Sequence, residues 1–252
     1  MQLTRDNYHS IEANAHYMSA SQYLAFSKCE ANAMASIRGK WTKQVTQSML
    51  IGSYIDAHFS NEMDLFKAQN PQIFKKNGEL MAAFEQANVI IQRIEQDTLM
   101  MEYLTGEHQV IKIGTIEGVP FKTKMDVYRP GERIVDQKIM RDFAYIWHEG
   151  ARRTFVEVWG YDYQATIYQA TEGNRLPFIM AAATKESEPD IALLQVPQDV
   201  IDDRMDMVNH YAPIFQMIKL GLQEPTRCEK CDYCKATRVL RGVIDYRDLE
   251  DN

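Results

Sequence analysis

Hydrophobic residues recur every three or four positions in several stretches of the first hundred residues, a spacing that predicts amphipathic helices. The pattern predicts helices over residues 19–37, 46–60 and 77–97. The first begins with Ser19-Ala20-Ser21, a helix-capping signal, and places Cys29 near the end of this helix or just after it. The N-terminal part of the chain is therefore expected to be helical.

The periodicity changes after residue 107. Residues 108–139 are rich in Val, Ile and Thr and are interrupted at Glu117-Gly118 and around Pro130-Gly131, where Gly and Pro favour tight turns. This pattern predicts a three-stranded meander. Further elements are predicted as a helix over 153–173, two strands over 176–184 and 190–196, and a long helix over 198–220.

Together these elements predict an α/β fold, in which a central mixed sheet of meander and hairpin is flanked by helices. Neither a repeat nor an obvious linker divides the 252 residues, so one domain over 1–252 is expected. Its parts are a helical region over 1–105, a sheet and helix over 106–197, and a C-terminal helix with a cysteine segment over 198–252.

Composition narrows the class of protein. The chain is 45% hydrophobic and 25% charged, which is typical of a globular protein with a sizeable core. No stretch approaches the roughly 18 consecutive apolar residues of a membrane helix, and the polar start lacks a secretory signal, so we expect a cytoplasmic protein without a membrane partner. A net charge of -7 excludes a global attraction to nucleic acid but is compatible with a local basic channel.

Three of the four cysteines, Cys228, Cys231 and Cys234, lie within seven residues. In a reducing compartment this clustering indicates metal binding rather than disulfides. The spacing repeats the ferredoxin run that binds three corners of a [4Fe–4S] cluster, where the remaining ligand comes from elsewhere. Cys29 is the remaining cysteine. Four thiolates suit Zn²⁺ equally well, so a cluster and a zinc site both remain open, and incidental thiols are the third interpretation.

The meander carries a pattern with catalytic potential. Asp126 is expected to end one strand and Asp136 to lie near the end of the next, so a hairpin could bring the two carboxylates together. Asp136 and Lys138 are two residues apart and therefore lie on the same face of their strand. Converging carboxylates favour a hard cation such as Mg²⁺, and the lysine could orient or deprotonate a water. The alternative interpretation is an ion pair at a sheet edge.

Three further residues strengthen the catalytic interpretation. Gln164 and Tyr168 lie at i and i+4 on the helix after the meander, so both polar ends point the same way. His58 lies on an earlier helix, where its imidazole is a candidate metal ligand. Taken singly, His58 is more often a satisfied buried histidine, and the other two form a helix-surface pair. Their joint occurrence in the order His, Asp, Asp-x-Lys, Gln-x-x-x-Tyr is the stronger signal.

This order resembles the PD-(D/E)xK nuclease superfamily and specifically its exonuclease branch. That branch includes lambda exonuclease, the RecE-type exonuclease VIII nucleases of phages and prophages, and the nuclease domains of AddAB-type helicase-nucleases. The resemblance extends over nearly the whole chain, and Met125 stands where the motif's name has a proline. It implies a restriction-endonuclease-like core. The residue roles that it implies are metal ligation by His58, Asp126, Asp136 and the Gln137 carbonyl, catalysis by Lys138, and orientation of active-site or substrate groups by Gln164 and Tyr168.

The implied function is a Mg²⁺- or Mn²⁺-dependent exonuclease that hydrolyses linear double-stranded DNA from its ends and leaves single strands for recombination. A single-strand annealing recombinase is a plausible partner, and a homo-oligomer is expected because lambda exonuclease and the RecE-type enzymes form rings. The alternative is a non-catalytic module that binds DNA ends or a partner on a nuclease-like scaffold. Basic residues near the expected site that could bind phosphate, although each could also be an ordinary surface charge, are Arg141, Arg152, Arg153 and Lys185.

The resemblance also bears on the cysteines. AddAB-type nuclease domains and related CRISPR adaptation nucleases hold an iron–sulfur cluster with one cysteine before the nuclease core and three after it. By this similarity, Cys29, Cys228, Cys231 and Cys234 would hold one [4Fe–4S] cluster that closes the fold, and Zn²⁺ is the alternative occupant.

Overall fold

The computed structural model describes residues 2–42, 44–240, 242–243 and 245–248. Within this part of the chain, the main sheet has five strands in the order β1-β2-β3-β6-β7. Their bounds are β1 (Glu107–Ile116), β2 (Val119–Arg129), β3 (Arg133–Met140), β6 (Phe178–Thr184) and β7 (Ile191–Gln195). β3 and β6 are parallel, and the other neighbouring strands are antiparallel. The expected mixed α/β sheet, with a meander followed by a hairpin, is confirmed.

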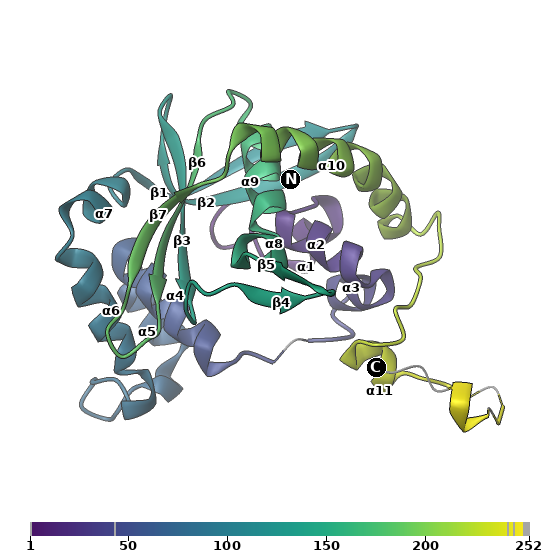
Figure 1. Cartoon of the computed structure of the whole chain (residues 1–252), viewed down its shortest axis with the longest axis horizontal. Helices are drawn as coiled ribbons and strands as arrows, with labels where there is room; N and C mark the ends of the chain where they lie inside the picture. The colour runs from purple at the N-terminus through teal and green to yellow at the C-terminus, as the bar shows by residue number, and fades with distance from the viewer. Residues whose placement is uncertain (1, 43, 241, 244, 249–252) are drawn as a thin grey trace.

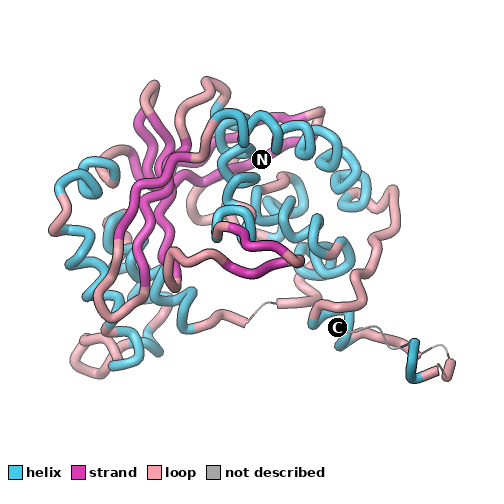
Figure 2. The backbone as a smooth tube through the Cα atoms, viewed as in Figure 1, coloured by secondary structure: helices cyan, strands magenta, loops and turns pink. Residues whose placement is uncertain are grey.

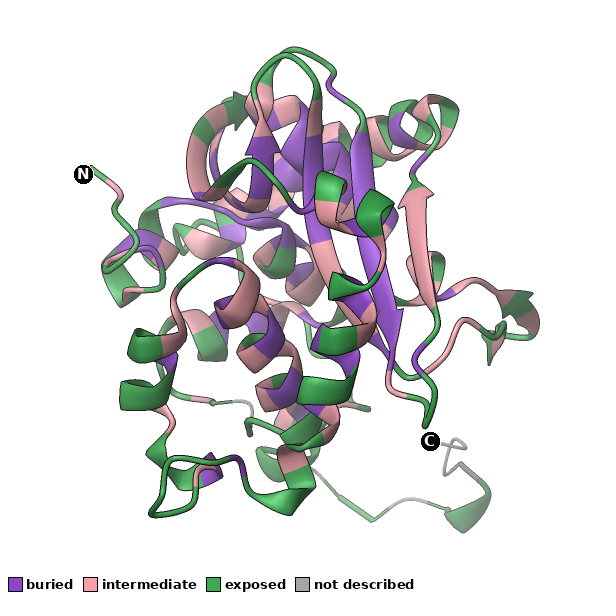
Figure 3. Cartoon of the chain, turned by 90° about the vertical axis from the view of Figure 1, so that its left-hand side faces the viewer, coloured by how far each residue is buried: buried purple, intermediate pink, exposed green. Residues whose placement is uncertain are grey.

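Helices cover both faces of this sheet (Figure 1). One face carries α4 (Gln47–Phe59), α5 (Met63–Gln69), α6 (Gln86–Glu95) and α7 (Thr98–Tyr103). The other carries α1 (Ile11–His16), α2 (Ala20–Lys28), α3 (Glu30–Ile37), α9 (Tyr161–Glu172) and α10 (Gln198–Lys219). Figure 3 shows the middle strands of the sheet largely buried between these layers, whereas the edge strand β7 is mostly half-buried. Each face of the sheet has its own apolar core. The core between the sheet and α9 contains Phe121 and Phe178 and is called the α9 core, and the core between the sheet and α4 contains Val135 and Ile179 and is called the α4 core.

A short hairpin and several short helices complete the described fold. β4 (Ile146–His148) and β5 (Ala151–Arg153) pair with each other apart from the main sheet (Figure 2). The remaining elements are η1 (Pro71–Ile73), η2 (Ala82–Phe84), α8 (Phe155–Trp159), α11 (Asp232–Ala236) and η3 (Tyr246–Asp248). Within the described ranges, no helix is both long enough and apolar enough to cross a membrane.

Two predicted helices are divided in the structure. The helix predicted over 19–37 breaks at Cys29, whose backbone is extended (φ −167°, ψ 108°), and α3 starts at the next residue. The helix predicted over 153–173 breaks at Gly160, which has a left-handed backbone (φ 71°) between α8 and α9. These breaks are consequential because Cys29 belongs to the cysteine group and α9 carries Gln164 and Tyr168.

The helix predicted over 77–97 is shorter than expected, since only residues 86–95 form α6. Asn77-Gly78 forms a turn instead, with Gly78 at a φ of 85°. Leu80 then pairs with Phe74 in an isolated bridge and is buried in the α4 core. Burial of this leucine by a bridge therefore overrides the helical spacing around it.

Candidate active site and cysteine cluster

The two predicted carboxylates lie where β2 and β3 separate. The strands pair only over residues 127–129 and 133–135, and continuing this register places Asp126 opposite Asp136. Where the pairing stops, the Asp126 side chain replaces it, because its Oδ2 accepts a hydrogen bond from the Gln137 N–H at 2.9 Å. The carboxylates are therefore brought together as predicted, although both lie inside their strands rather than at the ends.

The backbone is irregular at Asp126. Met125 belongs to the α9 core and Val127 to the α4 core, although residues two apart on a regular strand point to the same face. On the neighbouring strand, Gln109 occupies the register position opposite Asp126 and has a φ of 54°. The alternation of β2 side chains between the two faces of the sheet is thus interrupted at Asp126, whose carboxylate belongs to the site.

Asp136 is held from two sides. Its side chain is 3% exposed, Oδ1 accepts a hydrogen bond of 2.6 Å from the Gln164 amide, and Oδ2 forms an ion pair with the Lys138 ammonium. That ammonium also lies 4.6 Å from the ring centroid of Tyr161. The expected shared face of Asp136 and Lys138 is confirmed, and α9 contributes both the amide and the ring.

The charges of the site perturb one another. Burial is the largest influence on Asp126 and raises the pKa of its carboxyl well above the usual value, and the carboxylates of Asp136 and Asp56 raise it further. Burial opposes the charge of Lys138, but Asp136 and Asp126 outweigh it and raise the pKa of this ammonium. A buried group of carboxylates with one lysine favours the binding of a cation.

A third carboxylate, Asp56 of α4, approaches this group and was not predicted. Asp56, Asp126 and Gln137 line one pocket of about 430 Å³. The Gln109 amide donates to both Asp56 oxygens, at 3.1 and 3.3 Å. Burial raises the pKa of Asp56 to about 6, against a lowering by Lys124 and with a further increase from Asp136.

His58 lies elsewhere. It is two residues after Asp56 on α4, which is about 200° around a helix, and its Nε2 lies 2.8 Å from a carboxylate oxygen of Glu95. The structure therefore brings Asp56, and not His58, to the other carboxylates. One sequence signal was available, since Ser48 and Gly52 precede Asp56 at steps of four and leave that helix face open to a pocket.

Tyr168 lies beside the site: burial raises the pKa of its hydroxyl well above the usual value, Asp136 and Asp126 raise it further, and the Gln164 side chain lowers it through a hydrogen bond. Its hydroxyl donates a 2.9 Å hydrogen bond to the Lys124 carbonyl, and its ring packs edge-on against Phe178. Tyr168 thereby ties α9 to β2, whereas Gln164, one turn earlier, reaches the carboxylate of Asp136.

Two of the four predicted phosphate-binding residues lie beside the carboxylates. Arg141 and Lys185 line a pocket of about 480 Å³ that shares Ser48 with the Asp56 pocket. Arg152 lies on the β4–β5 hairpin with its guanidinium 5.1 Å from the Tyr145 ring centroid, and Arg153 is the next residue of β5. The structure thus places one pair next to the carboxylates and the other on the hairpin.

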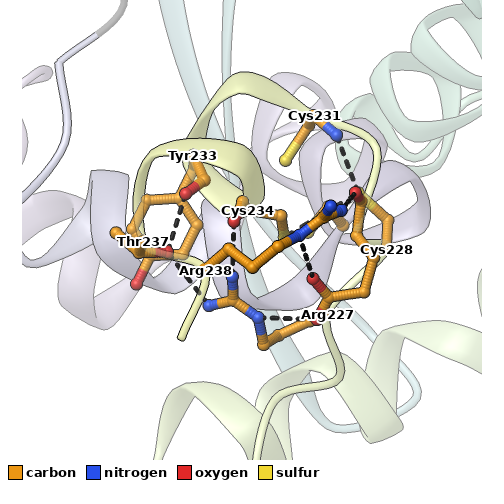
Figure 4. Close-up of polar contacts among 9 residues, drawn as sticks. Arg227, Cys228, Cys231, Tyr233, Cys234, Thr237 and Arg238 are labelled. Atoms are coloured by element: carbon orange, nitrogen blue, oxygen red, sulfur yellow. Dashed lines mark hydrogen bonds and ion pairs between the residues drawn. The ribbon is translucent and has the colours of Figure 1, made fainter. Parts of the chain in front are cut away.

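The four cysteines form a second group. Cys29, Cys228, Cys231 and Cys234 bring their sulfur atoms within 4.8 Å of one another. Cys29 lies between α2 and α3, Cys228 and Cys231 lie on the segment that leads into α11, and Cys234 lies inside α11 (Figure 4). The predicted association of Cys29 with the C-terminal cysteines is confirmed, and the group can bind a metal.

Comparison with known proteins places this fold and site in a family. A family described as a PDDEXK-like domain of unknown function (DUF3799) matches residues 19–237. The chain belongs to this family. Its five-stranded mixed sheet is accordingly a PDDEXK-like core, and the superfamily expected from the sequence is confirmed.

A solved structure resembles this PDDEXK-like chain along nearly its whole length. It is the crystal structure of a "Putative exonuclease" from Eubacterium rectale, with 42% sequence identity and a TM-score of 0.94. The alignment covers 99% of this chain and 98% of that one. No curated protein matches the sequence. The family and this structural neighbour support a nuclease.

The carboxylate group of this PDDEXK-like chain has the right donors for a divalent metal. Asp56, Asp126 and Asp136 supply carboxylate oxygens, the hard ligands that Mg²⁺ and Mn²⁺ favour. Lys138 and Gln164 each contact one oxygen of Asp136. The donor set therefore fits a divalent cation. In the structure, the Lys138 ammonium supplies the positive charge that balances these carboxylates.

Proposed function

We propose that this protein is a divalent-metal-dependent exonuclease that hydrolyses the phosphodiesters of linear double-stranded DNA from its ends. One observation carries the proposal. Asp126 and Asp136 face each other across the split between β2 and β3, with Lys138 in contact with Asp136. Membership of the PDDEXK-like family and the 42% identity to a "Putative exonuclease" support the same conclusion.

Asp56, Asp126 and Asp136 would hold Mg²⁺ or Mn²⁺, with the Gln137 carbonyl as the proposed further ligand. Such an ion lowers the pKa of water and offsets the charge that develops on the phosphate. Gln164 fixes the direction of the Asp136 carboxylate by donating to its Oδ1, and Gln109 does the same for Asp56. Both carboxylates are thereby oriented before any ligand arrives.

Lys138 is the residue proposed to act on the attacking water. With its raised pKa, the ammonium stays protonated at neutral pH while Asp136 and Asp126 are its nearest charges. With a divalent cation on the carboxylates, Lys138 would lose the partners that raise its pKa. Its ammonium could then orient the water, or release its own proton to solvent so that the neutral amine could receive one from the water. The Tyr161 ring, at 4.6 Å, keeps the ammonium directed into the site.

The proposed DNA path runs from the Asp56 pocket to the pocket lined by Arg141 and Lys185. The two pockets share Ser48, Met49 and Ile139, so a phosphate backbone can pass from the basic residues to the carboxylates. The Arg141 side chain is 81% exposed and therefore accessible to a strand that enters from solvent. Phosphate contacts of this kind position DNA without reading its sequence.

The decisive experiment compares wild type with Asp136→Asn on a linear duplex that carries a label at one end or the other. With Mg²⁺ or Mn²⁺, wild type is expected to release the label progressively, and EDTA is expected to stop it. The asparagine variant keeps the size of the side chain and the hydrogen bond to Gln164 but loses the charge, so it should bind DNA without degrading it. Release of label from only one end gives the polarity.

A covalently closed circle separates the proposed activity from endonuclease activity, because an exonuclease leaves it intact. Wild-type protein that binds linear duplex but degrades none of it with either metal would instead support the binding module. Two further parts of the proposal, both drawn from the resemblance to RecE-type enzymes, are a homo-oligomer around the DNA and delivery of single strands to an annealing recombinase. Size-exclusion chromatography with light scattering tests the first, and co-purification with a co-expressed annealing protein tests the second.

A further inference from the structure

The cysteine group holds its sulfur atoms too close together for the iron–sulfur cluster that the family resemblance implies. The Sγ atoms of Cys29 and Cys234 are 3.6 Å apart, and those of Cys228 and Cys234 are 3.9 Å apart. All four lie within 4.8 Å of one another. These distances define the space that an occupant can fill.

A single tetrahedral ion fits this space. Four thiolates bound to Zn²⁺ at about 2.3 Å stand about 3.8 Å from one another, which matches the two shortest separations. In a [4Fe–4S] cluster, each thiolate binds a different iron at a corner of a cube. Its four sulfurs therefore lie outside the corners and much farther apart than around one ion.

The backbone around the group is arranged for these short separations. The Cys231 N–H donates to the Cys228 sulfur at 3.3 Å, which fixes the turn between the two ligands. Cys231 then occupies the N-cap position of α11, and Cys234 lies inside this helix and is fully buried. Widening the group for a cluster would break this turn or move α11.

Hydrogen bonds that do not involve the sulfur atoms also hold the cysteine segment in this position. The Arg227 guanidinium donates to the Cys234 carbonyl at 2.7 Å and to the Thr237 hydroxyl at 3.0 Å (Figure 4). On the Cys29 side, Glu30 accepts hydrogen bonds from the Thr226 N–H and hydroxyl, both at 2.7 Å. The Ala31 N–H in turn donates to the Thr226 carbonyl. The two halves of the site are thus joined independently of the sulfur atoms.

We propose that Cys29, Cys228, Cys231 and Cys234 form a closed mononuclear site for Zn²⁺ in place of a [4Fe–4S] cluster. Four protein ligands leave no open position on the ion, so the site is structural and not catalytic. Zn²⁺ binds such a site more tightly than Fe²⁺ and has no redox chemistry of its own. The proposal does not depend on the nuclease function, because the carboxylate group contributes none of these ligands.

The test is elemental analysis of the full-length protein, expressed with zinc and iron both supplied and purified without oxygen. We expect one tightly bound zinc per chain, no acid-labile sulfide and a colourless sample. Growth with cobalt is expected to give the intense visible ligand-field bands of a tetrahedral cobalt–thiolate site. About four irons with sulfide per chain and a brown colour, or one iron per chain, would overturn the proposal.

Variants locate the metal. Cys29→Ser is expected to lose the zinc, and Lys230→Ala, which changes an exposed side chain between two ligands, is expected to keep it. Asp136→Asn is also expected to keep it, which separates this zinc from any ion at the carboxylates. Should the protein emerge without metal, hydrogen exchange over residues 226–237 is compared after loading with zinc and, separately, with iron and sulfide. Zinc is expected to protect this segment, and protection by iron and sulfide alone contradicts the proposal.

Discussion

Asp56 and His58 are two residues apart on α4, and this offset decides which of them reaches the carboxylates. Asp56 lines the pocket with Asp126, whereas His58 pairs with Glu95 on the outer side. Asp56→Asn is therefore expected to reduce turnover on the order of 10²–10³-fold, because a charged group at the reacting centre is lost. His58→Ala is expected to leave turnover within about twofold of wild type.

Initial rates on a linear duplex at saturating Mn²⁺ measure both effects. The Asp56→Asn loss should be partly recovered by raising the metal concentration if Asp56 binds the ion. A His58→Ala variant that is folded but as inactive as Asp56→Asn would show that the imidazole turns into the site when metal and DNA bind.

The raised carboxyl pKa values predict how metal binding stabilises the fold at different pH. Asp56 has a pKa of about 6 in the folded state and 3.8 when unperturbed, so the folded state binds more protons between these values. The free energy of unfolding of the metal-free protein therefore falls as the pH rises through this window. The raised pKa of Asp126 extends the fall to higher pH.

A bound cation offsets this penalty only when the carboxyls are ionised. The increase in thermal midpoint on adding Mn²⁺ is accordingly expected to be small near pH 5 and larger near pH 7.5. Thermal unfolding with and without Mn²⁺ across this range measures it, with Asp126→Asn as the control that should lose most of the increase. An equal increase at every pH would contradict the assignment of these carboxyls to the metal.

At the scale of elements, the break between α8 and α9 sets the position of the Gln164 amide. Gly160 has a φ of 71°, and a Cβ there would stand 2.5 Å from the Leu24 side chain of α2. Gly160→Ala therefore combines backbone strain with a clash, and we expect it to lower the free energy of unfolding by about 2–4 kcal/mol. Gly173 ends the same helix at a φ of 92° with open space around it.

Gly173→Ala is therefore the matched control, since it carries backbone strain without the clash. It should destabilise the protein by about 1–2 kcal/mol. Denaturant unfolding measures the difference between the two variants. Adding Leu24→Ala to Gly160→Ala should restore the stability that Gly160→Ala loses beyond the loss of Gly173→Ala. If the effects of Leu24→Ala and Gly160→Ala simply add, the clash with Leu24 is not the cause of that extra loss.

The β4–β5 hairpin exposes an aromatic side chain next to the proposed DNA path. Trp147 is 72% exposed, and Ile146 beside it lines the same pocket as Arg141 and Lys185. If DNA follows this path, stacking on a base contributes about 1–3 kcal/mol, so Trp147→Ala should weaken DNA binding roughly tenfold or more. Fluorescence anisotropy with Ca²⁺ in place of Mg²⁺ measures affinity without cleavage.

Leu99→Ala on α7 is the control for the loss of an exposed apolar side chain, because Leu99 is 54% exposed on an element far along the chain from the hairpin. Its affinity for DNA should equal that of wild type. Unchanged binding by Trp147→Ala would move the DNA path away from the hairpin.

The sequence predicts the regular elements well and the irregular ones poorly, for physical reasons. The meander, α4 and α10 follow strong two- or four-residue periodicity over many positions, so their local pattern agrees with their burial. The hairpin β4–β5 has strands of only three residues, too short for a periodic signal. The helix breaks at Cys29 and Gly160 depend on tertiary contacts, because Cys29 joins the C-terminal cysteines and Gly160 sets the position of α9. The local spacing of hydrophobic residues does not encode such contacts.

The candidate site divides in the same way. Asp136 and Lys138 were predictable because strand alternation alone puts them on one face. Asp56 was not, since its place depends on how α4 lies against the sheet and on the shift in β2 alternation at Asp126. The choice between Asp56 and His58 required the tertiary structure.

At the scale of the whole molecule, the cysteine group joins residues 29 and 228 but is not what brings these regions together. The long helix α10 already packs across the N-terminal helices, because Phe215 stacks on Phe26 with ring centroids 5.3 Å apart and the Tyr23 hydroxyl donates to the Met207 carbonyl. The Lys219 ammonium, at the end of α10, donates to the Tyr17 carbonyl at 2.6 Å. Because α10 is already held in place up to Lys219, the free loop that the cysteine group closes runs only from Lys219 to Cys228.

Because loop-closure entropy depends on the length of the loop that is actually free, a metal at the cysteines should order the C-terminal segment and contribute little to the rest of the fold. The apolar cluster around the cysteines is small, with Cys29, Ala31 and Cys234 as its buried members among the described residues. Removing the metal with a strong chelator is expected to leave the global thermal midpoint within a few degrees. Hydrogen exchange should accelerate over residues 226–237 and at Ala31, whereas the Gln137 amide, bonded to Asp126, should stay protected. Cooperative unfolding of the whole chain on chelation would show instead that the cysteine group holds α10 against the N-terminal helices.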